Sequence, residues 1–113
     1  MDIIGKYKLL KFKKKNLGNT KLVKAIDKLL DDITLNNWRS QTELTNDRKD
    51  ADCVHKDGFY FFDINVHRTL VLIVFEKNEA IIQWVGTHAD YESTFKNNKK
   101  TIETWLRNRG QIK

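Results

Sequence analysis

The chain has 113 residues, of which 40% are hydrophobic, 11% aromatic and 32% charged, and its formal net charge is +6. This length fits one globular domain, and the aromatic content excludes a chain that is disordered throughout. No run approaches the ~20 apolar residues that a membrane-spanning helix needs. The single cysteine, Cys53, excludes an intramolecular disulfide and the zinc frameworks built from several cysteines.

The positive charge is concentrated at the two ends of the chain. Residues 1–30 carry a net charge of +7 and residues 91–113 carry +4, whereas residues 31–60 and 61–90 carry −3 and −2. Basic ends favour a polyanionic partner such as nucleic acid, although a lysine-rich helix face is often only a solvated surface. The first six residues contain an aspartate and no long apolar run, so no secretory signal is visible and a cytoplasmic protein is expected.

The first half of the chain has the hydrophobic spacing of helices. In residues 19–33 the apolar positions recur at helical intervals behind a candidate cap at Thr20, which predicts an amphipathic helix. Upstream, the lysine-rich segment 7–15 fits a short helix ending before Gly18, and a strand remains open as the alternative. The residues Ser40-Gln41-Thr42-Glu43 have the capping-box pattern of a third short helix.

Three later segments are rich in aromatic and β-branched residues and predict strands. They are residues 59–64, 69–75 and 80–85, and polar breaks separate them. Because the connections are short, we expect an antiparallel meander. The middle segment is apolar on both alternating sets of positions, which predicts that it lies at the centre of the sheet.

A last helix is expected near the end of the chain. Ile102, Trp105 and Leu106 recur at helical spacing, and Gly110 is a typical helix stop. The order of elements predicts an α+β fold, with N-terminal helices packed on a three- or four-stranded antiparallel sheet and a C-terminal helix. We expect one domain over residues 1–113, in which residues 93–113 form a basic helical extension.

The end of the third predicted strand runs directly into polar groups with chemical uses. If Thr87 caps a short helix, His88 and Tyr91 share one face of it, so that an imidazole and a phenol address one ligand. The alternative is a histidine bonded into the strand end beside a packed tyrosine. The sequence alone leaves both interpretations open.

Arg68 stands at the start of an apolar strand, on the same face as Leu70 and Leu72, where an unpaired cation is costly. It either reaches solvent at the strand end or lines a pocket beside the sheet and binds an anion. Gln83 interrupts the third strand in the same manner, and facing water is sufficient to explain it. The histidines and Cys53 have no standard zinc spacing, so neither a metal ion nor another cofactor is expected.

Two runs in this region carry a pattern known from one protein family. They are Ile64-Asn65-Val66-His67-Arg68-Thr69-Leu70 and Trp84-Val85-Gly86-Thr87-His88-Ala89-Asp90-Tyr91. They align without gaps on the pattern Gly-Asn, any residue, Tyr-Arg-Leu-Ile, a hairpin, and aromatic-Val-Gly-Thr-His-Ala-Glu-Tyr. This is the pattern of the HigB family of bacterial toxins, a branch of the RelE-like messenger RNA interferases, which the chain therefore resembles. Weaker agreement extends over about residues 9–92, and the family has the same order of helices before sheet.

Three positions depart from the family pattern. Ile64 replaces a glycine, His67 replaces a tyrosine, and Gln83 stands where the family often has an arginine. The missing cation favours an alternative in which the fold is kept as an RNA-binding or antitoxin-binding module with weakened catalysis. Residues 93–113 run past the family's usual end, so the resemblance implies nothing for them.

The resemblance implies the toxin of a type II toxin–antitoxin system, an endoribonuclease that cuts messenger RNA, commonly on the translating ribosome, without a metal ion. Its expected partners are messenger RNA, the ribosome and a helix-turn-helix antitoxin of the HigA type. Metal-free cleavage uses the ribose 2′-hydroxyl as nucleophile, and it needs a proton acceptor, a proton donor and cations around the phosphate. The resemblance assigns His88 as general acid or base, Arg68 as phosphate clamp and Tyr91 as second proton donor or stacking platform.

Further residues are expected to hold the RNA. Asn65 and Gln83 would orient it, and the basic ends of the chain would bind its backbone in a salt-sensitive manner. The basic residues expected to do so are Lys11, Lys13, Lys14, Lys99, Lys100 and Arg107. A third interpretation is a protein-interaction domain with no RNA role.

Overall fold

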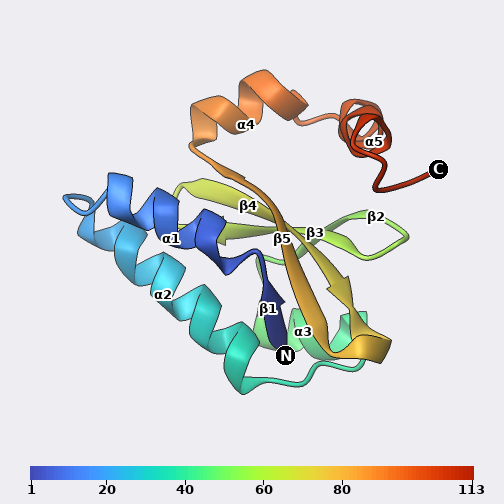
Figure 1. Cartoon of the computed structure of the whole chain (residues 1–113), viewed down its shortest axis with the longest axis horizontal. Helices are drawn as coiled ribbons and strands as arrows, with labels where there is room; N and C mark the ends of the chain where they lie inside the picture. The colour runs from blue at the N-terminus through green and yellow to red at the C-terminus, as the bar shows by residue number, and fades with distance from the viewer.

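A computed structural model describes residues 1–113 and contains a five-stranded mixed sheet with helices on both faces (Figure 1). The strand order is β1-β5-β4-β3-β2. The strands are β1 (Asp2–Ile4), β2 (Asp52–His55), β3 (Phe59–Ile64), β4 (His67–Val74) and β5 (Glu79–Gly86). The helices are α1 (Lys6–Lys15), α2 (Thr20–Leu35), α3 (Gln41–Asp47), α4 (His88–Phe95) and α5 (Lys99–Asn108). None of these helices combines the length and the apolar character needed to cross a membrane.

The predicted helices are present, with one correction at a cap. The segment that the sequence left open as helix or strand is the helix α1, which ends at Lys15. The cap of α2 is Asn19, whose side chain accepts a hydrogen bond from the backbone N–H of Leu22, so the prediction of Thr20 is wrong. Threonine and asparagine can both accept this bond. Because the helix begins at Thr20, the capping position before it is Asn19. Ser40 caps α3 as predicted.

The predicted meander is formed by β3, β4 and β5, which pair in antiparallel order. As predicted, β4 is the central strand of the sheet. The sheet has five strands instead of three or four, because β2 pairs antiparallel with β3 and β1 pairs parallel with β5. The parallel pair makes the sheet mixed instead of purely antiparallel. Strands of three and four residues are too short to leave an alternating pattern in the sequence.

The sheet is buried on both faces because each face has its own layer of helices. Tyr60 and Phe62 of β3 belong to the core beneath α1 and α2, whereas Phe59 and Phe61 belong to the core beneath α4 and α5. All four side chains are almost fully buried. A strand covered on both faces has no polar side, which explains the uninterrupted aromatic run of β3.

The basic C-terminal segment is packed into the molecule. Phe95, Ile102 and Leu106 are buried against the face of the sheet that carries Phe61 and Leu70. Figure 1 shows α4 and α5 together on the side of the sheet away from α1 and α2. Residues 93–113 therefore supply one wall of a hydrophobic core in addition to their positive charge.

Candidate active site

One end of the sheet brings together the start of β4, the end of β5 and the start of α4. Arg68 pairs in register with Gly86, and the backbone N–H of His88 donates to Nδ1 of His67 at 2.9 Å. Gly86 is needed for this close approach, because a Cβ there would lie 2.5 Å from the Trp84 ring and 3.0 Å from Cβ of Asp90. The sequence therefore allows α4 to begin directly against the strand that precedes it.

The first turn of α4 is held by the predicted cap. The side chain of Thr87 accepts from the backbone N–H of Asp90 at 3.1 Å, and the Asp90 carboxylate accepts from the N–H of Thr87 at 3.0 Å. The prediction that His88 and Tyr91 share a face is confirmed, since their rings are stacked with centroids 6.5 Å apart. This reciprocal cap fixes the backbone of the helical turn that carries His88 and precedes Tyr91.

Arg68 is enclosed by two aromatic rings and two carboxylates. Its Cζ lies 4.9 Å from the centre of the Tyr91 ring and 5.4 Å from that of Phe61. Nε lies 3.2 Å from Asp63 Oδ1, and Nη1 lies 3.6 Å from Asp52 Oδ2. The side chain is 25% exposed. The guanidinium thus lies on the predicted face of the sheet, with its charge already balanced by neighbours that the sequence did not indicate.

Tyr91 lies between these groups and is only 4% exposed. Its hydroxyl donates to Oδ1 of Asn97 at 2.9 Å. Burial raises the pKa of the phenol above its ordinary value of 10.0, and the nearby charge of Arg68 opposes this shift. The phenol is therefore neutral at physiological pH and retains a proton.

His88 differs from its two neighbours in its exposure. Its side chain is 64% exposed, and its only charged neighbour is Glu92, whose Oε1 lies 3.6 Å from Nε2. The imidazole can therefore meet a large substrate directly. None of the four cavities on the surface is lined by Arg68, His88 or Tyr91, so the three form an open cluster and not an enclosed pocket.

The two predicted RNA-orienting residues do not contact this cluster directly. Asn65 is exposed in the turn between β3 and β4, and its φ of 64° explains an asparagine there, because asparagine tolerates left-handed backbone. Gln83 is the extra residue of a β-bulge, since pairing passes from Leu70 with Trp84 to Val71 with Ile82. Its side chain lines a groove beside α1, separate from the Arg68 cluster.

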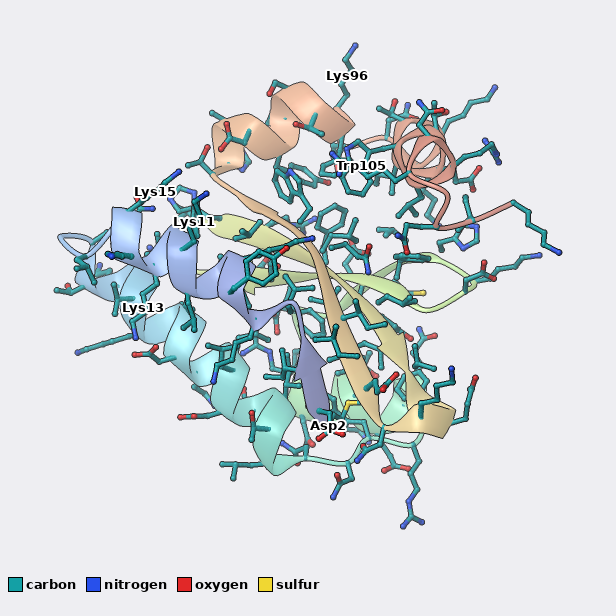
Figure 2. All side chains as sticks on the ribbon, viewed as in Figure 1. Asp2, Lys11, Lys13, Lys15, Lys96 and Trp105 are labelled. Carbon is teal, nitrogen blue, oxygen red and sulfur yellow. The ribbon has the colours of Figure 1, made fainter.

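That groove has a volume of about 360 Å³ and runs between α1 and β5 to the end of α5. It is lined by Tyr7, Lys8, Lys11, Phe12, Lys15, Gln83, Trp84, Val85 and Arg109. Four of these side chains are cationic and none is acidic. The spacing of Lys8, Lys11 and Lys15 along one helical face is the sequence signal that could have indicated it. Figure 2 shows Lys11 and Lys15 on the side of α1 toward α4, and Lys13 pointing away from it.

The other predicted RNA-binding cations do not join this groove. Lys13 forms an ion pair with Asp27 of α2 at 2.7 Å, and Lys14 is exposed outside the groove. Lys99 and Lys100 lie at the start of α5 beside two other cavities. Nε of Arg107 donates to the backbone carbonyl of Lys113 at 3.2 Å. Of the residues predicted to bind RNA, Lys11 and Gln83 therefore line the same groove, and the other predicted cations lie outside it.

No three His, Cys, Asp or Glu side chains lie close enough together to hold a metal ion. Comparison with known protein families matches residues 23–94 to the HigB toxin family, described as the RelE-like toxic component of a toxin-antitoxin system. The match covers more than half of the chain and includes the Arg68, His88 and Tyr91 cluster, but it leaves out α1 and α5. Comparison with curated proteins finds no significant match.

Proposed function

The chain belongs to the HigB family of RelE-like toxins, and from this premise we propose that it is the toxin of a type II pair and cuts messenger RNA as an endonuclease. The observation that carries the proposal is that a cation and an imidazole both lie against the phenol ring of Tyr91. Arg68 lies 4.9 Å from the centre of the Tyr91 ring, and the His88 ring lies 6.5 Å from it. These are three group types that metal-independent RNA cleavage uses.

In the proposed reaction the ribose 2′-hydroxyl attacks the adjacent phosphorus, and the bond to the 5′-oxygen breaks. The exposed imidazole of His88 takes the proton from the nucleophile or gives one to the leaving oxygen, since imidazole exchanges protons near neutral pH. Tyr91 keeps its proton in a hydrogen bond to Asn97 and is 4% exposed, so its proposed role as proton donor or stacking platform requires that bound RNA displace Asn97 and expose the phenol. Histidine and tyrosine thereby cover both proton transfers without a metal ion.

Arg68 is the proposed clamp for the phosphate. Its bond to Asp63 at 3.2 Å holds Nε, and its pairing with Asp52 is longer, at 3.6 Å, and involves a half-exposed carboxylate. Because the 3.6 Å distance is long for an ion pair and the Asp52 carboxylate is reached by solvent, a phosphate can displace Asp52 and accept from the terminal nitrogens. Asp63 then continues to orient the guanidinium.

The proposed partners follow from the same role. Messenger RNA is the substrate and the translating ribosome is the place of cleavage, which the net charge of +6 supports through attraction to RNA. A helix-turn-helix antitoxin of the HigA type is proposed to silence the activity. Asn65 in the turn beside β4 is proposed to contact the RNA next to the cluster.

The test is primer extension on messenger RNA after induction of the wild type and of His88→Gln, which keeps a polar side chain but cannot titrate. We expect discrete cuts within translated codons in the wild type and their loss in His88→Gln. His55→Gln, which changes a histidine on β2 outside the cluster, is the matched control and should cut as the wild type does. Persistent cutting by His88→Gln would show that the site assignment is wrong.

A second function is favoured by two specific observations. The charge of Arg68 is balanced by Asp52 and Asp63, and position 83, where the family often has an arginine, carries a neutral glutamine whose side chain lines the separate groove beside α1. These features fit a module that binds RNA or an antitoxin with weakened catalysis. If this alternative holds, the wild type will arrest growth or bind ribosomes but produce no discrete cuts.

A further inference from the structure

We propose that the groove between α1 and β5 binds single-stranded RNA, with phosphates on its cations and an unpaired base on its aromatic side chains. The inference rests on the proposed function in one respect: RNA in this groove is the strand that continues to His88. The lining, shape and position of the groove support this binding.

The cationic lining is concentrated and uncompensated. Lys8, Lys11, Lys15 and Arg109 contribute four positive charges, and no carboxylate lines the groove. Lys11 and Lys15 form no ion pair, in contrast to Lys13 on the same helix, which is paired with Asp27. Figure 2 shows this division of the lysines around α1. Free cations on a concave surface attract the phosphates of a polyanion.

Aromatic and amide groups lie among these cations. Tyr7 is 67% exposed, and the Trp84 ring is anchored by edge contact with Phe95 at 5.0 Å. Gln83 uses its amide nitrogen to reach the carbonyl of Ile81 at 3.3 Å and keeps its side-chain oxygen free to accept from a base. Cations interleaved with aromatic faces are typical of surfaces that bind single strands, because unpaired bases stack on rings.

The sheet edge explains why the groove exists. β1 pairs with β5 only as far as Ile81, so the edge of β5 beyond that residue is not covered by another strand. Lys8 reaches this edge and approaches the carbonyls of Ile82 and Gln83 at 3.4 and 3.3 Å. The remaining space between α1 and the edge is the groove, and Arg109 at the end of α5 closes one side of it.

The groove leads toward the candidate active site. Val85 lines it and stands three residues before His88, a separation of roughly 10 Å along extended chain. The ring centre of Phe12, which lines the groove, also lies 6.3 Å from that of His67, whose Nδ1 accepts from the backbone N–H of His88, so RNA bound in the groove can continue to the imidazole. α1 and Arg109 lie outside residues 23–94, so most of this surface is built by parts of the chain beyond the family match.

The test measures binding of a fluorescein-labelled, single-stranded 2′-O-methyl RNA of mixed sequence by anisotropy over a range of salt concentrations. For Lys11→Ala/Lys15→Ala we expect affinity to fall on the order of ten-fold at low salt, and the slope of log K against log salt to become less steep by about 1.4. Lys21→Ala/Lys24→Ala removes the same charge from exposed positions of α2 and should bind as the wild type does. Equal binding by the two double variants would overturn the proposal.

The stacking part of the proposal is tested by Tyr7→Ala, which should weaken binding about five-fold or more, and by Tyr7→Phe, which keeps the ring and should bind normally. Tyr7 is exposed, so neither change removes core packing. A duplex RNA of the same length should compete poorly. Effective competition by the duplex, or normal binding by Tyr7→Ala, would show that no unpaired base is held in the groove.

The binding experiment tests the groove separately from the proposed nuclease activity. 2′-O-methyl RNA lacks the nucleophilic hydroxyl, so binding is measured without cleavage. If groove variants bind normally while the wild type cuts messenger RNA, the groove inference alone is wrong. If the groove variants lose binding while the wild type makes no cuts, the endonuclease proposal alone is wrong.

Discussion

Tyr60 lies on β3 between the rings of Phe62 and Phe75 and is 2% exposed. Burial, together with the neighbouring Cys53, raises the pKa of its phenol to about 12. The unfolded chain ionises this tyrosine near its ordinary pKa of 10.0, whereas the folded chain does not. The free energy of unfolding is therefore unaffected by the ionisation of this tyrosine below pH 10. It falls as the pH rises from 10 toward 12, because only the unfolded chain loses the proton in this range.

This linkage gives a measurable prediction. Between about pH 9 and about pH 11 the free energy of unfolding should fall by about 1 kcal/mol more in the wild type than in Tyr60→Phe. Urea unfolding of both proteins at the two pH values measures the difference, and the phenylalanine variant cancels the contribution of other titrating groups. An equal loss in the two proteins would mean that Tyr60 is not the group responsible.

For single residues, the sequence predicted the sheet face on which a side chain lies better than it predicted the side chain's neighbours. The alternation of β4 correctly placed Arg68 on the face of Leu70. Its partner Asp52 was not predicted, because it comes from a strand too short to recognise. Gln83 was expected to orient RNA, which stays a prediction, and the sequence did not show that it lines the groove beside α1, since a bulge interrupts the alternation of β5 there.

The helix α4 depends on its first turn, because His88 and Tyr91 both follow the Thr87 cap within four residues. Thr87→Ala removes the acceptor for the N–H of Asp90 and should lower the free energy of unfolding by about 1 kcal/mol. Nuclease activity should fall as well, since the two rings lose their fixed spacing. Urea unfolding and primer extension measure the two effects.

Thr87→Ser is the control for this prediction because it keeps the hydroxyl that accepts the bond. It should unfold and cut almost as the wild type does. A Thr87→Ala variant with wild-type stability would show that the reciprocal bond from Asp90 is sufficient to hold the helix start.

Helices and strands with a strong hydrophobic pattern were predicted correctly, and those with a weak pattern were left open or missed. α2 buries five side chains on one stripe and was predicted clearly. α1 buries only Leu9 and consists largely of lysines, so its pattern could not distinguish helix from strand. β1 was not predicted, because its three residues acquire strand geometry only by pairing with β5, far away in the sequence.

The whole molecule consists of two hydrophobic cores separated by one sheet. Leu106 of α5 is fully buried in the core that also contains Phe61 and Tyr91. Leu106→Ala should lower the free energy of unfolding by about 2–5 kcal/mol, because the substitution leaves a cavity that the surrounding side chains cannot fill completely. Urea unfolding measures this cost.

The matched control is Leu17→Ala, which removes the same atoms from a side chain that is 61% exposed. It should change stability by no more than about 0.5 kcal/mol. Similar effects of the two substitutions would contradict the view that α5 is part of the core and would make it an appended segment.

At this scale the sequence predicted the α+β class and the meander, since both arise from local patterns. It did not predict the groove, which joins α1, the end of β5 and Arg109. Nor did it predict that α5 would cover a sheet face, because the stripe of Ile102, Trp105 and Leu106 predicts a helix but not the surface on which it packs. Surfaces assembled from distant parts of a chain leave no local signal.

The position of α5 after every strand has a consequence for biosynthesis. While the protein is being translated, Phe59 and Phe61 are made long before Ile102 and Leu106, so one side of the nascent sheet is covered at most by α4 until the final helix emerges. The unfinished polypeptide exposes apolar surface that a chaperone can recognise. A chain that ends before this helix therefore lacks the part of this hydrophobic core that Ile102 and Leu106 supply.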